Sequence, residues 1–273
     1  MAERCSSSRL RERNPSGSQA RVRDEWRPSG WRCLERDARD MCGRYVTTTS
    51  PERLAEIFGA SVVDIEWSPR FNLAPSAQAP VIGTNGSDRT VTSARWGLIP
   101  HWSREDVGAR LSNARGETVW DKPSFRDAVR RHRVIVPMDA FYEWAPASPD
   151  GPRTRAGRPA KRPHLFTRRD GGVLNVAGIA SVWKRGEAPI ATFAVVTTAA
   201  NGTMSPIHDR MPVILDDNGV DRWLDPDDQP EDLLQPAADD LLEMWEVATE
   251  VNDARNEGAH LTEPVDPTST TLF

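Results

Sequence analysis

The sequence has no run of about 18 apolar residues, and no positively charged start that leads into an apolar segment. A membrane-spanning helix and a secretion signal are therefore not expected. We found no internal repeat either, so a repeat architecture is not indicated. These absences predict a cytoplasmic protein that does not bind a membrane.

Cysteine is scarce. The chain has three cysteines, Cys5, Cys33 and Cys42, all near its start, and no C-x-x-C pair. An odd number gathered in one segment argues against a disulfide framework, and the missing pairs argue against a cysteine-based zinc site. This use of cysteine suits a reducing compartment, and we expect no metal ion.

The formal net charge is −5, which is unusual for a nucleic-acid-binding protein, but the charges are unevenly distributed. Residues 216–273 hold two Arg against seventeen acids, whereas residues 41–215 hold 23 Lys or Arg against 16 acids. A basic body with an acidic tail is compatible with phosphate binding, because the local field matters more than the total charge. A merely solvated surface would also fit these counts.

One pentapeptide, 41–45 (MCGRY), places a cysteine directly after a methionine. If translation begins at Met41, removal of that methionine leaves Cys42 with a free α-amino group and a thiol. Such a 1,2-aminothiol condenses with an aldehyde to an imine and then closes to a thiazolidine. The reference pKa values, about 7.7–8.0 for the amine and about 8.5 for the thiol, leave a nucleophilic fraction of each at cellular pH. A buried structural cysteine is the alternative.

Residues 1–40 are rich in Arg, Ser, Pro and Gly and have little apolar periodicity. They predict either a disordered extension or untranslated sequence ahead of a true start at Met41. We favour the second interpretation, because an intact extension would block the amine of Cys42. We expect one domain over residues 41–265, followed by a tail over 266–273.

Short apolar runs separated by turn signals indicate many short strands with scattered helices. A helix is expected over 51–58, with Ser50 as its N-cap and Gly59 at its end, and a basic helix over 124–131. Two acidic amphipathic helices are expected within 219–245, and a loop over 70–75. The expected strands are 45–49, 79–83, 90–96, 133–137, 165–168, 173–179, 190–197 and 213–215. This pattern predicts an α+β fold with a mainly antiparallel β core and peripheral helices.

Several residues are candidates for catalysis or for contact with a substrate. Glu143 stands between two aromatic residues, which should partly desolvate its carboxylate, raise its pKa and suit it to proton transfer; a strand-end glutamate that faces solvent is the alternative. His208 lies beside Asp209 and Arg210 in a polar interruption between apolar strands, where a catalytic and a structural role are equally open. Asn113 could orient a substrate or cap a turn. Trp96 and Trp102 offer flat surfaces for stacking bases, although a buried core position is the commoner fate of tryptophan.

Six motifs occur in order and together resemble the SOS-response-associated peptidase (SRAP) family, whose domain crosslinks to abasic sites in DNA. The resemblance covers about residues 41–260, and the motifs are M-C-G-R-Y at 41–45, R-F-N-L-A-P at 70–75, W-G-L-I-P-H-W at 96–102, S-N-A-R-G-E-T at 112–118, F-Y-E-W at 141–144 and I-H-D-R-M-P at 207–212.

The resemblance implies a role for each residue that matches a family motif. Cys42 would form a thiazolidine with the ring-opened sugar, and Asn113 would position that sugar. Glu143 would carry protons, and His208 would assist ring opening and reversal. The implied DNA-contacting residues are Arg44, Asn72, Pro75, Trp96, Arg115, Lys122 and Thr197.

The family resemblance also implies the partners. It implies a monomer that binds single-stranded DNA containing abasic sites, works with replication-fork proteins at the nucleoid, and needs no metal or organic cofactor. Two other classes stay open: a cysteine hydrolase or self-processing peptidase that uses Cys42, and a non-covalent binder of single strands.

Overall fold

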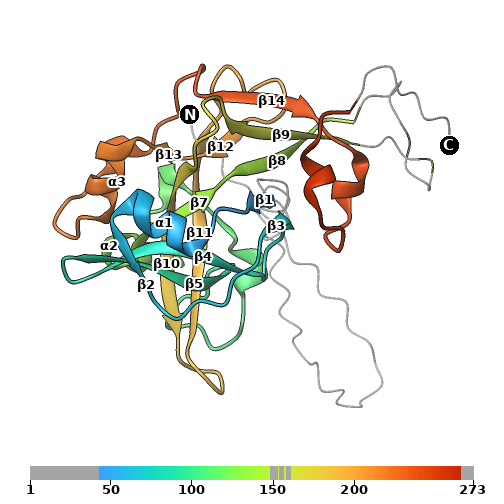
Figure 1. Cartoon of the computed structure of the whole chain (residues 1–273). Coiled ribbons are helices and arrows are strands. Elements are labelled where there is room, and N and C mark those ends of the chain that lie inside the picture. The colour runs from blue at the N-terminus through green and yellow to red at the C-terminus, as the bar shows by residue number, and fades with distance from the viewer. Residues whose placement is uncertain (1–42, 148–152, 154–156, 158–160, 266–273) are drawn as a thin grey trace, which may run out of the picture. The chain divides into compact units, whose positions relative to one another are not determined.

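The computed structural model describes residues 43–147, 153, 157 and 161–265 (Figure 1). The predicted extension, the predicted nucleophile Cys42 and the predicted tail over 266–273 lie outside these ranges. The described part contains a five-stranded sheet in the order β14-β9-β8-β1-β3. Its strands are β1 (Arg44–Thr47), β3 (Arg70–Leu73), β8 (Ala140–Ala145), β9 (Arg162–Arg168) and β14 (Leu242–Glu246).

A second, nine-stranded sheet has the main order β12-β11-β10-β7-β4-β5-β2, with β6 and β13 attached to it. Most pairings are antiparallel, and the exceptions are β2 with β5, β5 with β11 and β6 with β11. Its strands are β2 (Ala60–Val62), β4 (Gln78–Asn85), β5 (Asp88–Trp96), β6 (Asn113–Arg115), β7 (Arg133–Met138), β10 (Leu174–Trp183), β11 (Ile190–Ala199), β12 (Arg210–Pro212) and β13 (Ile214–Leu215). Together with the few helices, this confirms the predicted α+β class.

Three short α-helices accompany the sheets in the described ranges: α1 (Pro51–Phe58), α2 (Arg126–Arg131) and α3 (Asp217–Leu224). The bounds of α1 are those predicted, because its caps are local. The Ser50 hydroxyl accepts a hydrogen bond from the Arg53 N–H, and Gly59 adopts a left-handed conformation with φ of 59°. The remaining short turns of 3₁₀-helix are Gly108–Arg110, Gly116–Thr118, Glu231–Leu233, Thr249–Asn252 and Ala259–Thr262.

Two predictions about the elements were wrong. Residues 70–73 form strand β3 rather than a loop, because β1 provides a pairing partner. The second acidic helix expected within 219–245 is absent from this described stretch, where β14 pairs with β9 instead. In β14, Leu242 is buried and Trp245 donates its indole N–H to the Thr262 carbonyl. These tertiary contacts outweigh the helical periodicity of the acidic segment.

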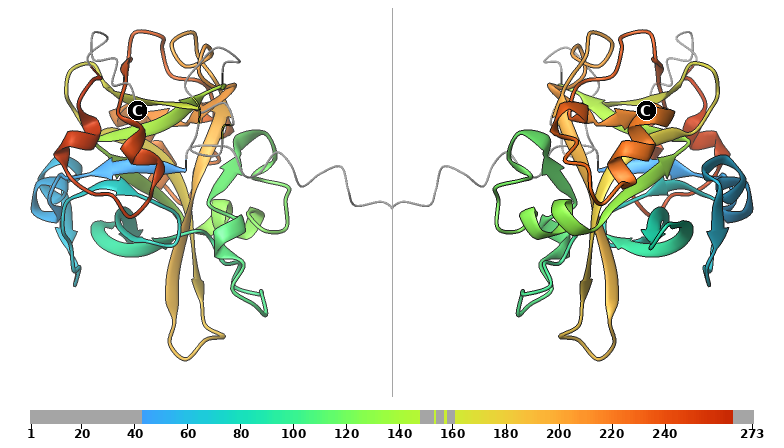
Figure 2. Two further views of the ribbon diagram at one scale, coloured as in Figure 1. Left: turned by 90° about the vertical axis from the view of Figure 1, so that its right-hand side faces the viewer. Right: turned by 90° about the vertical axis from the view of Figure 1, so that its left-hand side faces the viewer.

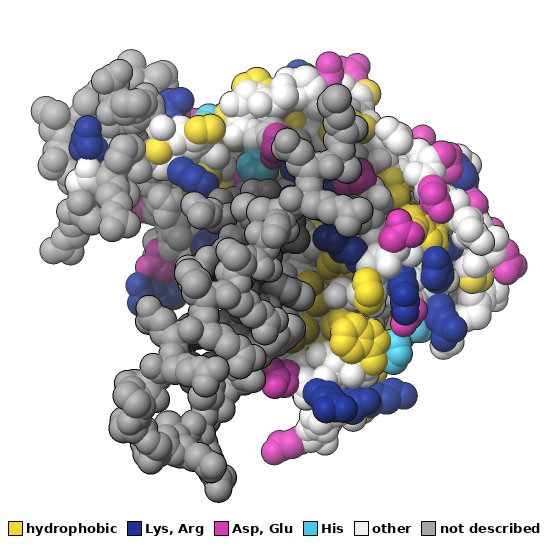
Figure 3. Space-filling model, turned by 180° about the vertical axis from the view of Figure 1, so that it is seen from behind, with side chains coloured by type: hydrophobic (Ala, Val, Ile, Leu, Met, Phe, Trp, Pro, Cys, Tyr) yellow, Lys and Arg dark blue, Asp and Glu magenta, His cyan; other side chains and the backbone are white. Residues whose placement is uncertain are grey.

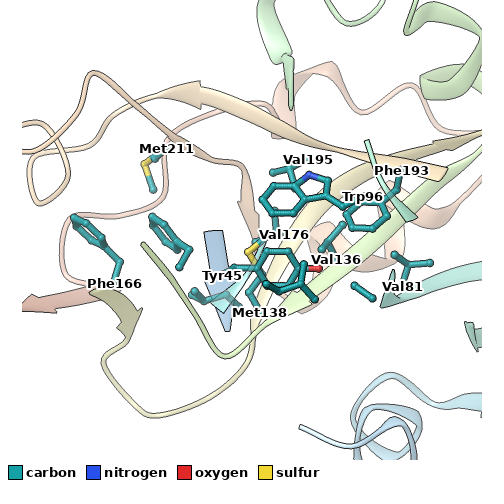
Figure 4. Close-up of a cluster of buried hydrophobic side chains, with 14 of the residues drawn as sticks. Tyr45, Val81, Trp96, Val136, Met138, Phe166, Val176, Phe193, Val195 and Met211 are labelled. Atoms are coloured by element: carbon teal, nitrogen blue, oxygen red, sulfur yellow. The ribbon is translucent and has the colours of Figure 1, made fainter. Parts of the chain in front are cut away.

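Aromatic packing joins the two sheets (Figure 4). Tyr45 of β1 meets Trp96 of β5 edge to face, with ring centroids 5.1 Å apart, and Trp96 stacks on Phe193 of β11 at 6.4 Å. All three side chains are at most 1% exposed. The start of β1 is therefore anchored in the core of the larger sheet.

This core contains a costly polar group, the Tyr45 hydroxyl. It is buried and has no hydrogen-bond partner in the described part of the chain, and burial raises the pKa of Tyr45. Because an unsatisfied buried hydroxyl costs about 1–3 kcal/mol, Tyr45→Phe is expected to raise the free energy of unfolding by about 1 kcal/mol. Urea denaturation would measure the change.

The other tyrosine in the chain provides a matched control. The Tyr142 hydroxyl donates to the Phe71 carbonyl at 2.8 Å, so Tyr142→Phe should instead lower the free energy of unfolding by about 1 kcal/mol. Equal changes in the two variants would contradict the assignment of Tyr45 as unsatisfied.

Candidate active site

The start of β1 lies beside Glu143. In the antiparallel pairing of β1 with β8, Arg44 is opposite Tyr142 and Tyr45 is opposite Phe141. Extending this register by one pair places Gly43 opposite Glu143. The predicted nucleophile, Cys42, lies outside the described residues and is bonded directly to Gly43.

Glu143 is 2% exposed, which confirms the predicted burial of its carboxylate. One carboxylate oxygen accepts a hydrogen bond from the Trp144 N–H at 3.3 Å. A carboxylate held out of water next to the end of β1 is suited to proton transfer with a reactant there.

Asn113 and Arg115 lie on β6, which pairs with β11 at Val195 and Thr197. The residue before Asn113 is fixed to the core, because the Trp96 indole N–H donates to the Ser112 carbonyl at 2.9 Å. Trp96 also contacts Tyr45 of β1. A continuous chain of contacts therefore links the start of β1 to Asn113.

His208 is oriented by contacts at one of its ring nitrogens. Nδ1 lies 3.1 Å from the Arg210 N–H, from which it can accept a hydrogen bond, and 3.0 Å from the Asp209 carboxylate. Because these contacts engage Nδ1, Nε2 is the nitrogen suited to exchange a proton with a reactant.

Arg210 ties two of the sequence motifs together. Its guanidinium donates to both carboxylate oxygens of Glu117, one of them at 2.8 Å, and to the Thr197 carbonyl at 2.8 Å. The hydrogen bond from Arg210 lowers the pKa of the Glu117 carboxyl. The motif with Asn113 and the motif with His208 are therefore held against the same end of β11.

The structure corrects the prediction of direct DNA contact for three residues. Asn72, Trp96 and Thr197 are each at most 1% exposed. Asn72 binds backbone carbonyls, Trp96 packs in the core, and the Thr197 carbonyl accepts from Arg210. Their polar groups hold the protein together, which the sequence motifs alone did not reveal.

Arg44 is half-buried, and its side chain also holds segments of the protein together. Its guanidinium donates to the Asn72 amide oxygen and to the Val251 carbonyl, both at 2.8 Å. Desolvation lowers the pKa of Arg44, although the nearby Asp253 opposes this effect. The Trp144 indole N–H binds the Asn252 side chain at 2.6 Å. The segment around 251–253 therefore fixes both the start of β1 and the residue after Glu143.

Loss of the Asn72 amide should destabilise this arrangement. Asn72 donates to the carbonyls of Val251, Asp253 and Asn256 at 3.0–3.2 Å and accepts from Arg44. Asn72→Ala would leave these buried groups unsatisfied, so we expect a loss of about 2–4 kcal/mol in the free energy of unfolding. Urea denaturation would measure this loss.

Asn218→Ala is the control for Asn72→Ala. Asn218 is exposed on α3, and this substitution should change the free energy of unfolding by less than about 0.5 kcal/mol. A similar value for both variants would show that the hydrogen bonds of Asn72 contribute no net stability.

The side chains available to a ligand differ from the predicted set. Arg115 and Lys122 are exposed, and Pro75 is partly exposed in the turn after β3. Trp102 is 47% exposed, so of the two tryptophans considered from the sequence it is the one that presents a free ring. Nothing local in the sequence distinguished Trp102 from the buried Trp96.

Two features are absent from the described residues. Within these ranges, no group of three or more His, Cys, Asp or Glu side chains is arranged to hold a metal ion. Over the same residues, no helix has both the length and the apolar character needed to cross a membrane.

Comparison with known proteins identifies relatives over most of the chain. The family described as SOS response associated peptidase (SRAP) matches residues 41–254. The abasic site processing protein YoqW of Bacillus subtilis is 35% identical over 231 residues, which cover 82% of this chain and 99% of YoqW. The abasic site processing protein HMCES of Gallus gallus is 28% identical, over 73% of this chain and 67% of its own.

Solved structures support the fold. A protein from Bacteroides thetaiotaomicron superposes with a TM-score of 0.70 at 23% identity, covering 82% of this chain and all of that protein. A protein from Bordetella bronchiseptica superposes with a TM-score of 0.61 at 27% identity, covering 76% of this chain and all of that protein. On the family match and the YoqW relationship together, the chain belongs to the SOS response associated peptidase family.

Proposed function

We propose that this protein processes abasic sites in single-stranded DNA by capturing them covalently on Cys42. One observation carries the proposal: the register of β1 with β8 places Gly43, the neighbour of Cys42, opposite the buried Glu143. The names of relatives such as YoqW, an abasic site processing protein, supply the substrate class. Single strands exposed at replication forks are the proposed substrate in the cell, bound by a monomer at the nucleoid.

The chemistry is the condensation of an aldehyde with a 1,2-aminothiol. The closed sugar of an abasic site opens to expose an aldehyde at C1′. The Cys42 amine adds to C1′, water leaves as the imine forms, and the thiolate then adds to the same carbon to give the thiazolidine. Because both nucleophiles belong to one residue, the second step is intramolecular and benefits from a high effective concentration.

Each polar residue around the site has a role in this scheme. His208 Nε2–H or the Glu143 carboxyl donates a proton to the ring oxygen as the sugar opens. The Glu143 carboxylate accepts a proton from the attacking amine, and Asn113 holds the sugar. Arg115 and Lys122 contact phosphates, and Trp102 stacks on a base.

The requirement for an aldehyde gives a direct test. Single strands with one abasic site should form an adduct that survives denaturing electrophoresis. Strands whose abasic site has been reduced with borohydride carry an alcohol at C1′ and should form none, although they keep every phosphate contact. Equal adduct yields on the two strands would exclude aldehyde capture.

A phosphate contact at Arg115 should appear in the salt dependence of binding. Arg115→Ala is expected to weaken binding to all single-stranded sequences alike, and to reduce the slope of log K against log salt by about 0.7. Arg53→Ala is the control, because Arg53 is exposed on α1 and pairs with Glu56. Fluorescence anisotropy at several salt concentrations measures both slopes, and an unchanged slope for Arg115→Ala would exclude the contact.

The family description favours a second activity at the same residue. The sequence has residues 1–41 ahead of Cys42, and its amine becomes free only when these residues are absent. Translation from Met41 followed by removal of that methionine would achieve this, and so would hydrolysis of the peptide bond before Cys42. The second route is a peptidase reaction, and it predicts that full-length protein shortens on incubation whereas its Cys42→Ala variant does not.

A further inference from the structure

A cavity lies away from the candidate active site. It has a volume of about 550 Å³ and lies between the loop after β5, helix α2 and the end of β10. Its lining includes His101, Asp127, Arg131, His132, Val182 and Lys184. We refer to this cavity as the basic pocket.

Positive charge in the basic pocket is poorly balanced. Arg131 and Lys184 are exposed, and neither forms an ion pair within the described residues. The single lining acid, Asp127, lies 3.8 Å from Arg126, which is not part of the lining. Burial, together with the nearby charges of Arg131 and His101, lowers the pKa of His132. Such a site would gain free energy by binding an anion.

The loop that carries His101 is rigidly attached. The Trp183 indole N–H donates to the Ser103 carbonyl at 2.9 Å, which fixes the loop to the end of β10. Gly97 begins the loop with φ of 115°, and a Cβ at that position would lie 2.6 Å from the Gly108 carbonyl oxygen. Only glycine permits this close return of the chain. The pocket is therefore preformed.

The strand register places the basic pocket within reach of a DNA strand bound at the active site. Asn113 on β6 is aligned with Val195 on β11, which is opposite Gly178 on β10. The pocket residues of β10 begin at Ala180 and end just after the strand at Lys184. At about 3.3 Å per residue along a β-strand, these pocket residues lie about 7–20 Å along β10 from the position aligned with Asn113.

The elements that line the pocket lie side by side. Figure 2 shows the end of the β10–β11 hairpin projecting beside the green segment that includes the loop after β5 and α2. On the face seen in Figure 3, several Lys and Arg side chains lie near histidine and apolar side chains, with Asp and Glu side chains also nearby. Exposed Trp102 directly follows His101 of the pocket. Exposed cations next to an exposed aromatic ring are suited to a nucleic-acid strand.

We propose that the basic pocket binds backbone phosphates of the same DNA strand, a few nucleotides from the lesion. The inference rests on the proposed function and extends it: the preferred substrate is a strand with an arm long enough to reach Arg131 and Lys184. The active site selects the lesion, and the pocket adds affinity that is independent of sequence.

Binding of an undamaged 20-nucleotide single strand tests the pocket separately from the crosslink. We expect Lys184→Glu and Arg131→Glu each to lower the affinity for a 20-nucleotide strand by about tenfold at low salt, and to make its salt dependence shallower. Arg185→Glu is the matched control, because Arg185 is exposed beside Lys184 but does not line the pocket. We expect it to change the affinity less than threefold. Thermal melting checks that each variant is folded.

The arm length distinguishes the outcomes. With an abasic site flanked by a single nucleotide on each side, which is too short to reach the pocket, all variants should form adduct at the parent's rate at saturating protein. With ten-nucleotide arms, the two pocket variants should need about tenfold more protein for half-maximal adduct. If Arg185→Glu lowers the affinity as much as the two pocket variants do, the effect is a general one of positive surface charge, and the proposal is overturned. Unchanged affinity in both pocket variants would also overturn it.

Failure of the proposed function would look different. If the parent forms no adduct with any abasic DNA, aldehyde capture is wrong, yet the anisotropy data on undamaged strands still decide whether the pocket binds phosphates. A titration with a mononucleotide is one further experiment. Saturation of the pocket by a mononucleotide, with no preference for the 20-nucleotide strand, would point to a free phosphate compound and against DNA.

Discussion

Cys42→Ala is expected to abolish the stable adduct on abasic single-stranded DNA. Alanine keeps the α-amino group but lacks sulfur, so the imine can form and cannot close to a thiazolidine. Imines hydrolyse readily, and denaturing electrophoresis should therefore detect no adduct from Cys42→Ala. Borohydride added during the reaction reduces the imine, and it should restore a covalent product.

A further variant isolates the contribution of sulfur. Cys42→Ser, with an oxygen nucleophile in place of the thiolate, should resemble Cys42→Ala. A stable adduct of undiminished yield from Cys42→Ala without borohydride would remove Cys42 from the mechanism.

Glu143→Gln is expected to slow adduct formation by about 10²-fold or more, the usual contribution of general acid–base catalysis. The amide has the shape of the carboxyl group but cannot exchange a proton with the sugar or the amine. Glu143 is buried and lies across from Gly43, so bulk water is a poor substitute. Single-turnover kinetics on denaturing gels would measure formation, and adduct transfer to competing abasic DNA would measure reversal.

A change of stability must be separated from a change of rate in Glu143→Gln. Its free energy of unfolding should stay close to that of the parent, because glutamine can still accept the Trp144 N–H. Glu56→Gln, at an exposed position on α1, is the control and should react normally. Parent-like rates of both formation and reversal in Glu143→Gln would leave Glu143 with a structural role only.

Local signals allowed the sequence to predict some elements well. Helix α1 needs only the Ser50 cap, Pro51 and Gly59, all within its own segment. The burial of Glu143 followed from its aromatic neighbours. Local patterns cannot predict structure that depends on distant segments: β3 and β14 form because β1 and β9 provide partners.

The same distinction explains the DNA-contact predictions. Asn72 is polar and belongs to a recognisable motif, yet its partners are carbonyls at Val251, Asp253 and Asn256, about 180 residues away in the sequence. Trp96 and Trp102 share one motif but differ completely in exposure, because Trp96 lies under β1 and β11. Sequence motifs locate the site, whereas the tertiary contacts decide which side chains face a ligand.

Mass spectrometry of the intact protein, before and after reaction with abasic DNA, tests the central claim most directly. The account predicts a chain that begins at Cys42, and it predicts that only this form is consumed by the DNA, with a mass gain equal to the strand minus one water. A chain that retains residues ahead of Cys42 and is consumed equally fast would contradict it, because its Cys42 nitrogen would be an amide.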